Sequence, residues 1–135
     1  MKVELSYKGD EEFETTNDTG NKVDIDMFPA DQKQHQSPTQ LLLSALVACA
    51  AVDIVSMIKK RRKTFIDLKG SAEGDRREEH PRGFTKINLH YTITSPDLTD
   101  EEAERIVDLS TTKYCSVAGS LSAEQTHSFE IIRPS

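Results

Sequence analysis

The stretch SPTQLLLSALVACAAVDIVSMIKKRR, residues 37–62, decides the fold of this chain. Ser37 stands where an N-cap is expected, Pro38 at the first helical position and Gln40 at the third, which is the spacing of a capping box. Residues 41–52 are apolar almost all round, so the predicted helix has to be covered on several sides. One chain of 135 residues has little other material for that purpose. The stretch therefore predicts a central buried helix and favours an intertwined homodimer.

Composition narrows the class of the protein. The 17 basic and 23 acidic residues give a net charge of −6, which argues against a nucleic-acid partner. The first ten residues have no apolar h-region, and the run at 41–52 is shorter than the ~20 residues of a membrane span. Two cysteines without an export signal are expected to be free thiols in a reducing compartment. We therefore expect one soluble, cytoplasmic domain over residues 1–135, with no nucleic acid and no membrane as partner.

The rest of the chain has the patterns of strands and of one further helix. Alternation of apolar and polar residues predicts strands, which we expect at residues 3–7, 13–15, 23–27, 65–71, 84–94 and 126–132. Thr99 is expected to cap a second helix, whose apolar side would extend from Ala103 to Tyr114. Residues 115–119 are either the end of that helix or a short helix of their own. The order β-β-β-α-β-β-α-β is an α+β pattern.

The candidate chemistry reduces to two thiols, Cys49 and Cys115. The histidines lack metal-ligand spacing, and the sequence has no phosphate-binding loop or nucleophile elbow, so we predict no metal and no cofactor. Both cysteines also fit an inert thiol, because free cysteine behaves as a small hydrophobe. Each cysteine nevertheless lies on or beside one of the two predicted helices. If these helices pack, the sulfurs come within disulfide range, and such a pair can reduce a peroxide through a sulfenic acid.

Three motifs resemble the OsmC/Ohr family of osmotically inducible and organic-hydroperoxide-resistance proteins, in its YhfA-like branch. They are the stretch at 37–62, RREEHPRGFTKINLHYTIT at 76–94 and KYCSVAGSL at 113–121, and the likeness extends from residue 3 to residue 132. The resemblance implies an OsmC-like α+β fold and an intertwined homodimer whose central helices are wrapped by sheets from both chains. It also implies reduction of organic hydroperoxides in oxidative and osmotic stress defence. Cys49 would then attack the peroxide and Cys115 would resolve, with a dithiol such as a dihydrolipoyl group as reductant.

The chain departs from the family pattern at the start of its main helix. The family places a glutamate two residues after the proline, where it helps to orient an activating arginine; this chain has Gln40 there and no arginine before Arg61. An attacking thiol needs a cation or a helix dipole close by. Two alternatives therefore stand beside the peroxidase hypothesis. One is a non-catalytic dimeric module of the same fold that binds a small apolar ligand beside the cysteines, and the other is thiol chemistry on a different substrate.

Overall fold

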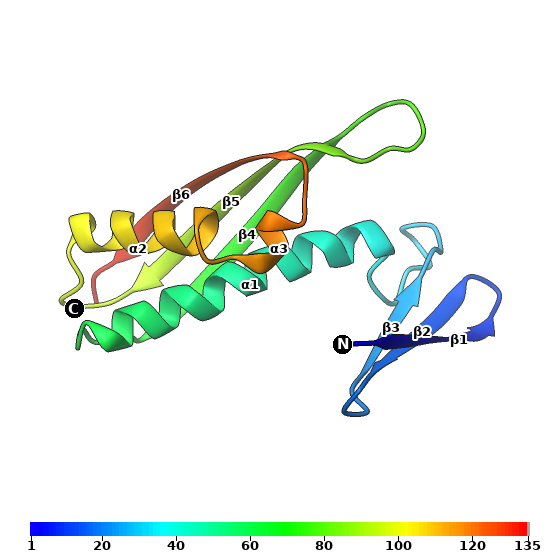
Figure 1. The fold of residues 1–135 in the computed structure, drawn as a ribbon, viewed down its shortest axis with the longest axis horizontal. Helices are drawn as coiled ribbons and strands as arrows, with labels where there is room; N and C mark the ends of the chain where they lie inside the picture. The colour runs from blue at the N-terminus through cyan, green and yellow to red at the C-terminus, as the bar shows by residue number, and fades with distance from the viewer. Residues whose placement is uncertain (135) are drawn as a thin grey trace. The chain divides into compact units, whose positions relative to one another are not determined.

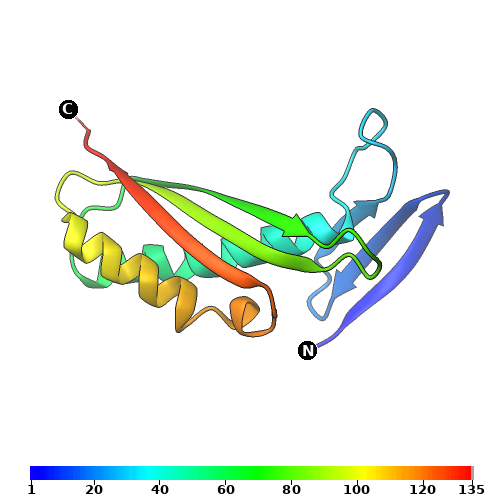
Figure 2. The ribbon, with the colours of Figure 1, turned by 90° about the horizontal axis from the view of Figure 1, so that it is seen from above.

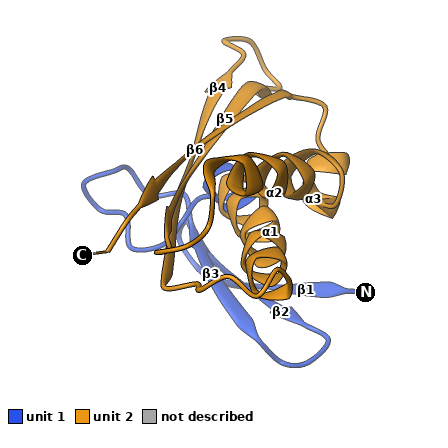
Figure 3. Cartoon of the chain, turned by 90° about the vertical axis from the view of Figure 1, so that its left-hand side faces the viewer, with its two compact units in different colours: residues 1–42 blue, residues 43–135 orange. Residues whose placement is uncertain are grey.

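The structure, a computed structural model, describes residues 1–134 and has the predicted α+β order with one addition (Figure 1, Figure 2). Its elements are β1 (Val3–Gly9), β2 (Glu12–Asn17), β3 (Lys22–Asp26), α1 (Pro38–Lys60), β4 (Asp67–Arg76), β5 (Phe84–Thr94), α2 (Asp100–Thr112), α3 (Ser116–Gly119) and β6 (Glu124–Ile132). The addition is α3, so the segment after Cys115 forms a short helix of its own. The chain divides into two compact units, with the boundary after Leu42 (Figure 3).

The first unit contains an antiparallel meander, β1-β2-β3, as the sequence predicts. Its strands pair in a register that places Leu5 opposite Thr15 and Thr15 opposite Val23. Alternation as in β1 is typical of a half-buried strand, but β1 is not half-buried in the single chain. Val3, Leu5 and Tyr7 are 60–66% exposed, and the first unit has a single sheet with no second layer of its own.

The segment that joins β3 to α1 is held by the fully buried carboxylate of Asp26. This carboxylate accepts hydrogen bonds from Lys33 Nζ (2.7 Å) and from the backbone N–H groups of Gln34 (2.9 Å) and His35 (2.7 Å). Burial raises the pKa of Asp26, but the Lys33 ammonium and the two backbone donors outweigh burial and lower the pKa to about 2. The segment is therefore an ordered loop that a buried ion pair holds in place.

The second unit is a three-stranded sheet, β4-β5-β6, with the helices on one of its faces (Figure 2, Figure 3). β4 and β5 are antiparallel, whereas β6 pairs with β5 in parallel after the crossover through α2 and α3. β4 begins two residues later than predicted and continues to Arg76. Residues 73–76 lie beyond the predicted end of this strand at residue 71, but they remain paired with β5, because a solvent-facing edge strand accommodates their charges.

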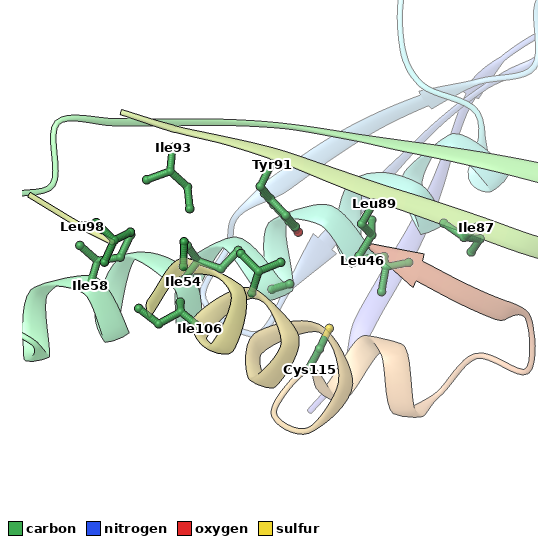
Figure 4. Packing of buried hydrophobic residues seen from close by; sticks show 13 residues of the cluster. Leu46, Ile54, Ile58, Ile87, Leu89, Tyr91, Ile93, Leu98, Ile106 and Cys115 are labelled. Carbon is green, nitrogen blue, oxygen red and sulfur yellow. The ribbon is translucent and has the colours of Figure 1, made fainter. Parts of the chain in front are cut away.

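The core of the second unit lies between this sheet and the helices (Figure 4). Its buried side chains come mainly from β5, α1 and α2; they include Ile87, Leu89, Tyr91, Ile93, Leu46, Ala50, Ile54, Ile58, Ala103, Ile106 and Val107. The buried positions of α1 recur every four residues, which describes a single face. Val52, on another side of α1, is 69% exposed. Within one chain, the predicted central helix is thus buried on one face and uncovered elsewhere.

α1 is also longer than the apolar run from which it was predicted. With 23 residues it is the helix of the described chain that is long and apolar enough to cross a membrane by length and composition. The prediction that this helix does not span a membrane was based on the length of residues 41–52 alone. The face of α1 that carries Leu46 and Ile54 packs in the protein core. The core helix of a soluble protein can meet the same criteria of length and apolar composition. The absence of a membrane partner stays a prediction.

α2 begins as predicted and ends earlier. Thr99 Oγ1 accepts a hydrogen bond from the backbone N–H of Glu102, and Glu102 Oε1 accepts one from the backbone N–H of Thr99, both at 3.1 Å, so a capping box closes the helix start. The helix ends at Thr112. Tyr114 lies beyond it and is 49% exposed, so the prediction of Tyr114 on the apolar face is wrong. The prediction assumed that the helix continues to Tyr114, but the helix ends two residues before it, at Thr112.

Candidate thiol site

The two cysteines are placed by different elements of the second unit. Cys49 lies on α1, immediately before the fully buried Ala50, and is partly buried. Cys115 lies between α2 and α3 in extended backbone conformation and is only 6% exposed. Its Sγ accepts a hydrogen bond from the backbone N–H of Ala118 at 3.3 Å, so Cys115 acts as the N-cap of α3. One thiol is therefore accessible in the single chain, and the other is enclosed.

The fold brings these two side chains together. Cys49 and Cys115 are separated by 65 residues in the sequence, yet both belong to one hydrophobic core, Cys115 as a buried member and Cys49 packed against it, and both are free thiols. The sequence allowed this approach on the condition that the two helices pack, and both helices do contribute to this core. The two thiols are close enough that Cys49 raises the pKa of Cys115. Their catalytic roles stay a prediction at this point.

The surroundings of Cys115 keep it protonated. Burial raises the pKa of Cys115, and the neighbouring Cys49 raises it further, whereas the backbone N–H groups of Ala118 and Val117 act in the opposite direction. The raised pKa lies above the ordinary thiol value, so Cys115 is a neutral thiol at pH 7. A neutral, enclosed thiol is poorly suited to make the first attack on a peroxide. It can still react with a partner that is already in contact with it.

Tyr91 is a residue of this site that the sequence placed only within the predicted strand at 84–94. Its hydroxyl donates a hydrogen bond of 2.7 Å to the backbone carbonyl of Val47, two residues before Cys49 on α1. Burial raises the pKa of Tyr91, and the nearby Cys115 and Cys49 raise it further. Figure 4 shows the Tyr91 hydroxyl directed toward α1, and the Cys115 sulfur directed into the same core. A buried phenol needs a hydrogen-bond partner, which is the signal that could have marked Tyr91.

Gln40 forms local hydrogen bonds at the start of α1. Its Oε1 accepts from the backbone N–H of Ser37 at 2.9 Å, and Ser37 Oγ accepts from the backbone N–H of Gln40 at 3.3 Å. These two bonds are the predicted capping box, so the structure gives Gln40 a role in helix capping. Gln40 is exposed and belongs to the first unit. A contribution of Gln40 to thiol chemistry stays a prediction.

The described residues 1–134 contribute no lysine or arginine to Cys49 through a hydrogen bond or ion pair. The cations at the end of α1 pair elsewhere, since Arg61 and Lys63 lie 3.7 and 3.4 Å from the carboxylate of Glu102. Lys22, on β3, pairs with Glu14 at 3.6 Å. No group of three or more histidine, cysteine, aspartate or glutamate side chains in this part of the chain is arranged to hold a metal ion. The site consists of two thiols, a phenol and backbone groups in an apolar setting.

Comparison with known proteins identifies the relatives of this chain. Residues 30–130 match the family model OsmC, described as OsmC-like protein. Protein YhfA of Escherichia coli K12 is 45% identical over 98 residues, which cover 71% of this chain and 73% of YhfA. A solved structure of a hypothetical protein from Aquifex aeolicus VF5 has 28% identity and a TM-score of 0.86, over 99% of this chain and 97% of that one.

More distant structures share the fold. An OsmC-like protein from Mycoplasma pneumoniae has a TM-score of 0.85 at 20% identity, over 98% of this chain and 96% of that chain. The organic hydroperoxide resistance protein OhrB of Bacillus subtilis has a TM-score of 0.61 at 18% identity, over 98% of both chains. The family match begins near the end of the first unit, covers most of the second unit and includes both cysteines. This chain therefore belongs to the OsmC family.

Proposed function

We propose that this protein is a thiol-dependent peroxidase that reduces organic hydroperoxides in the cytoplasm, in defence against oxidative and osmotic stress. The observation that carries the proposal is the placement of a partly exposed thiol, Cys49, and an enclosed one, Cys115, in the same hydrophobic core. Two neighbouring thiols can store and release two electrons as a disulfide. OhrB, which shares the fold, is named an organic hydroperoxide resistance protein, and this name supports the choice of substrate.

The proposed cycle has three balanced steps. The thiolate of Cys49 attacks the outer oxygen of the hydroperoxide, the O–O bond breaks, and a sulfenic acid and an alcohol form once the alkoxide takes up a proton. The thiol of Cys115 then attacks the sulfenic sulfur, which gives a Cys49–Cys115 disulfide and one molecule of water. A small dithiol finally exchanges with this disulfide, so both cysteines return to thiols and the dithiol becomes oxidised. The lower exposure of Cys115 supports a resolving role for this residue.

We propose a homodimer as the active form. In the single chain, apolar side chains of α1 and of the first unit are uncovered; they include Leu42, Val52, Val3, Leu5, Tyr7, Val23 and Met27. A three-stranded sheet needs a covered apolar face to be stable, and an uncovered apolar helix side has the same need. A second copy of this chain would cover both surfaces. Such a partner would also supply the positive charge that the Cys49 thiolate needs.

Gln40 has a supporting role in this proposal. The capping box with Ser37 fixes where α1 begins, and α1 carries Cys49. A neutral amide at this place cannot form the ion pair with a guanidinium that the family's glutamate forms. Gln40 would therefore orient an activating group through hydrogen bonds alone.

A second candidate function is the binding of a small apolar molecule without catalysis. A half-open pocket of about 240 Å³ lies next to Ala118, whose backbone N–H bonds to Cys115. The pocket is lined by Leu89, Thr111, Thr112, Ala118, Gly119, Ala123, Gln125, Thr126 and His127. This volume is below that of pockets for drug-sized ligands, so only a small molecule would fit. The apolar surroundings of the two thiols are also compatible with the binding of a small apolar molecule.

Peroxide consumption separates the two functions. The reduced protein is mixed with cumene hydroperoxide and dihydrolipoamide, and peroxide loss is followed for the wild type and for Cys49→Ser and Cys115→Ser. The proposal requires turnover by the wild type with the dithiol and no protein-dependent consumption by Cys49→Ser. In a sample without the dithiol, Cys115→Ser should consume a single equivalent and stop at the sulfenic acid, whereas the wild type should consume one equivalent and form the disulfide. Equal, slow loss of peroxide in all three samples would rule out the peroxidase and leave the binding module.

A further inference from the structure

A second feature of the core links the sheet directly to the turn of α1 that carries Cys49. Tyr91, on β5, is fully buried and donates its hydroxyl proton to the Val47 carbonyl at 2.7 Å. Val47 is within α1, where its carbonyl also accepts the ordinary helical hydrogen bond from the residue four positions later. The carbonyl therefore does not depend on Tyr91. The bond instead ties the α1 backbone, two residues before Cys49, to the middle of the sheet.

The neighbouring strand is shaped to admit this bond. Gly70, on β4, pairs directly with Tyr91. A Cβ atom at position 70 would lie 2.9 Å from Tyr91 Cδ1 and 3.2 Å from Val47 Cγ2. The first distance is shorter than such contacts ever are, and the ring cannot shift without moving its hydroxyl. Because glycine has no side chain, the Tyr91 ring can lie against the β4 backbone at Gly70, and the Val47 side chain can approach the sheet at the same place.

The phenol also lies within electrostatic reach of both thiols. Burial is the largest cause of the raised pKa of Tyr91, and the interactions with Cys115 and Cys49 raise this pKa further. Cys115 has its own anchor, because its sulfur accepts a hydrogen bond from the Ala118 N–H. The described contacts give Cys49 no comparable backbone anchor for its sulfur. The position of the Cys49 sulfur therefore depends on the position of the α1 turn that the Tyr91 hydrogen bond holds.

We infer that Tyr91, seated on Gly70, is a positioning residue for the thiol pair: by fixing α1 at Val47 it holds the Cys49 sulfur against Cys115 and favours the disulfide over the two thiols. The inference rests on the proposed function only in treating Cys49 and Cys115 as a redox pair. It requires no particular peroxide and no particular physiological reductant. Its subject is the equilibrium between the dithiol and the disulfide.

That equilibrium can be measured without a peroxide. The full-length protein is equilibrated with mixtures of reduced and oxidised dithiothreitol; oxidised dithiothreitol accepts two electrons and two protons as the Cys49–Cys115 bond forms. The disulfide fraction is read by alkylation of free thiols and intact mass. Tyr91→Phe removes the hydroxyl and keeps the ring. We expect this variant to form the disulfide at a ratio of oxidised to reduced dithiothreitol about tenfold higher than the wild type needs, which is a shift of about 30 mV in reduction potential. Gly70→Ala should shift the ratio in the same direction.

Controls separate positioning from general destabilisation. Tyr7→Phe removes an exposed hydroxyl that bonds to the Asp10 carbonyl in the first unit, and it should leave the ratio unchanged. The circular dichroism of Tyr91→Phe should match the wild type, so that the shift is read on a folded protein. A Tyr91→Phe ratio within twofold of the wild type, or a wild type that forms no disulfide at any ratio, would overturn the inference. If peroxide is not consumed but the Tyr91→Phe shift is present, the proposed peroxidase fails while this inference stands.

Discussion

The stability of the second unit should depend strongly on how α1 packs against the sheet. Ile54 is a fully buried residue of α1, and Ile66, in the connection between α1 and β4, is 52% exposed. Truncation of each to alanine removes the same three carbon groups. For Ile54 the lost transfer free energy is about 2.4 kcal/mol at about 0.8 kcal/mol per group. The cavity left behind adds to this loss, so the expected cost of Ile54→Ala is about 3 kcal/mol.

Ile66→Ala is the matched control. With half of its side chain in water already, it should lose about half of the transfer term, about 1 kcal/mol or less. Both variants are unfolded in urea at one protein concentration, because the stability of an oligomer depends on concentration. We expect the unfolding free energies of the two variants to differ by about 2 kcal/mol. Equal costs would refute the placement of Ile54 in the core and, with it, the seating of α1 on the sheet.

Three further predictions concern other parts of the chain. The folded-state pKa of Asp26, about 2, lies below the ordinary 3.8, so its contribution to stability is complete above about pH 4 and is lost as the pH falls through 2. Acid titration of wild type and Asp26→Asn, followed by circular dichroism, should show a steeper loss of wild-type stability in that window, and parallel curves would contradict the assignment. Val52→Asp, at a position 69% exposed in the single chain, should convert the proposed dimer to a monomer in light scattering, and an unchanged mass would exclude Val52 from the interface. Thr99→Ala should cost about 1 kcal/mol in urea unfolding through loss of the α2 cap, and no cost would show that the capping box is not needed.

Local signals in the sequence predicted most of the fold. The Ser37–Gln40 spacing and Thr99 as an N-cap marked the starts of both long helices, and a capping box is present at each of them. Period-two alternation predicted the strands. The signals were weaker where an element ends: β4 continues through charged residues, and α2 stops before Tyr114. Pairing with a neighbouring strand and the geometry of a turn decide such ends, and neither is a local property of the sequence.

The candidate site was predictable only in part. Cys49 and Cys115 could be singled out because each lies on or beside a predicted helix, and the structure places both in one hydrophobic core. The bond from Tyr91 to Val47 joins residues 44 positions apart, and it depends on strand register and on the glycine at position 70. The periodic pattern of apolar and polar residues does not reveal this combination of strand register, glycine and hydrogen bond. The uncovered face of β1 also escaped prediction, because alternation tells which side is apolar and not what covers it.

The central claim is that Cys49 and Cys115 form a peroxide-reducing pair. The most direct measurement is the mass of the peptides obtained after the reduced protein is treated with one equivalent of cumene hydroperoxide and the remaining thiols are alkylated. We predict a disulfide-linked peptide pair that contains Cys49 and Cys115, with one equivalent of alcohol released. Full alkylation of both cysteines, with the hydroperoxide still present, would contradict it.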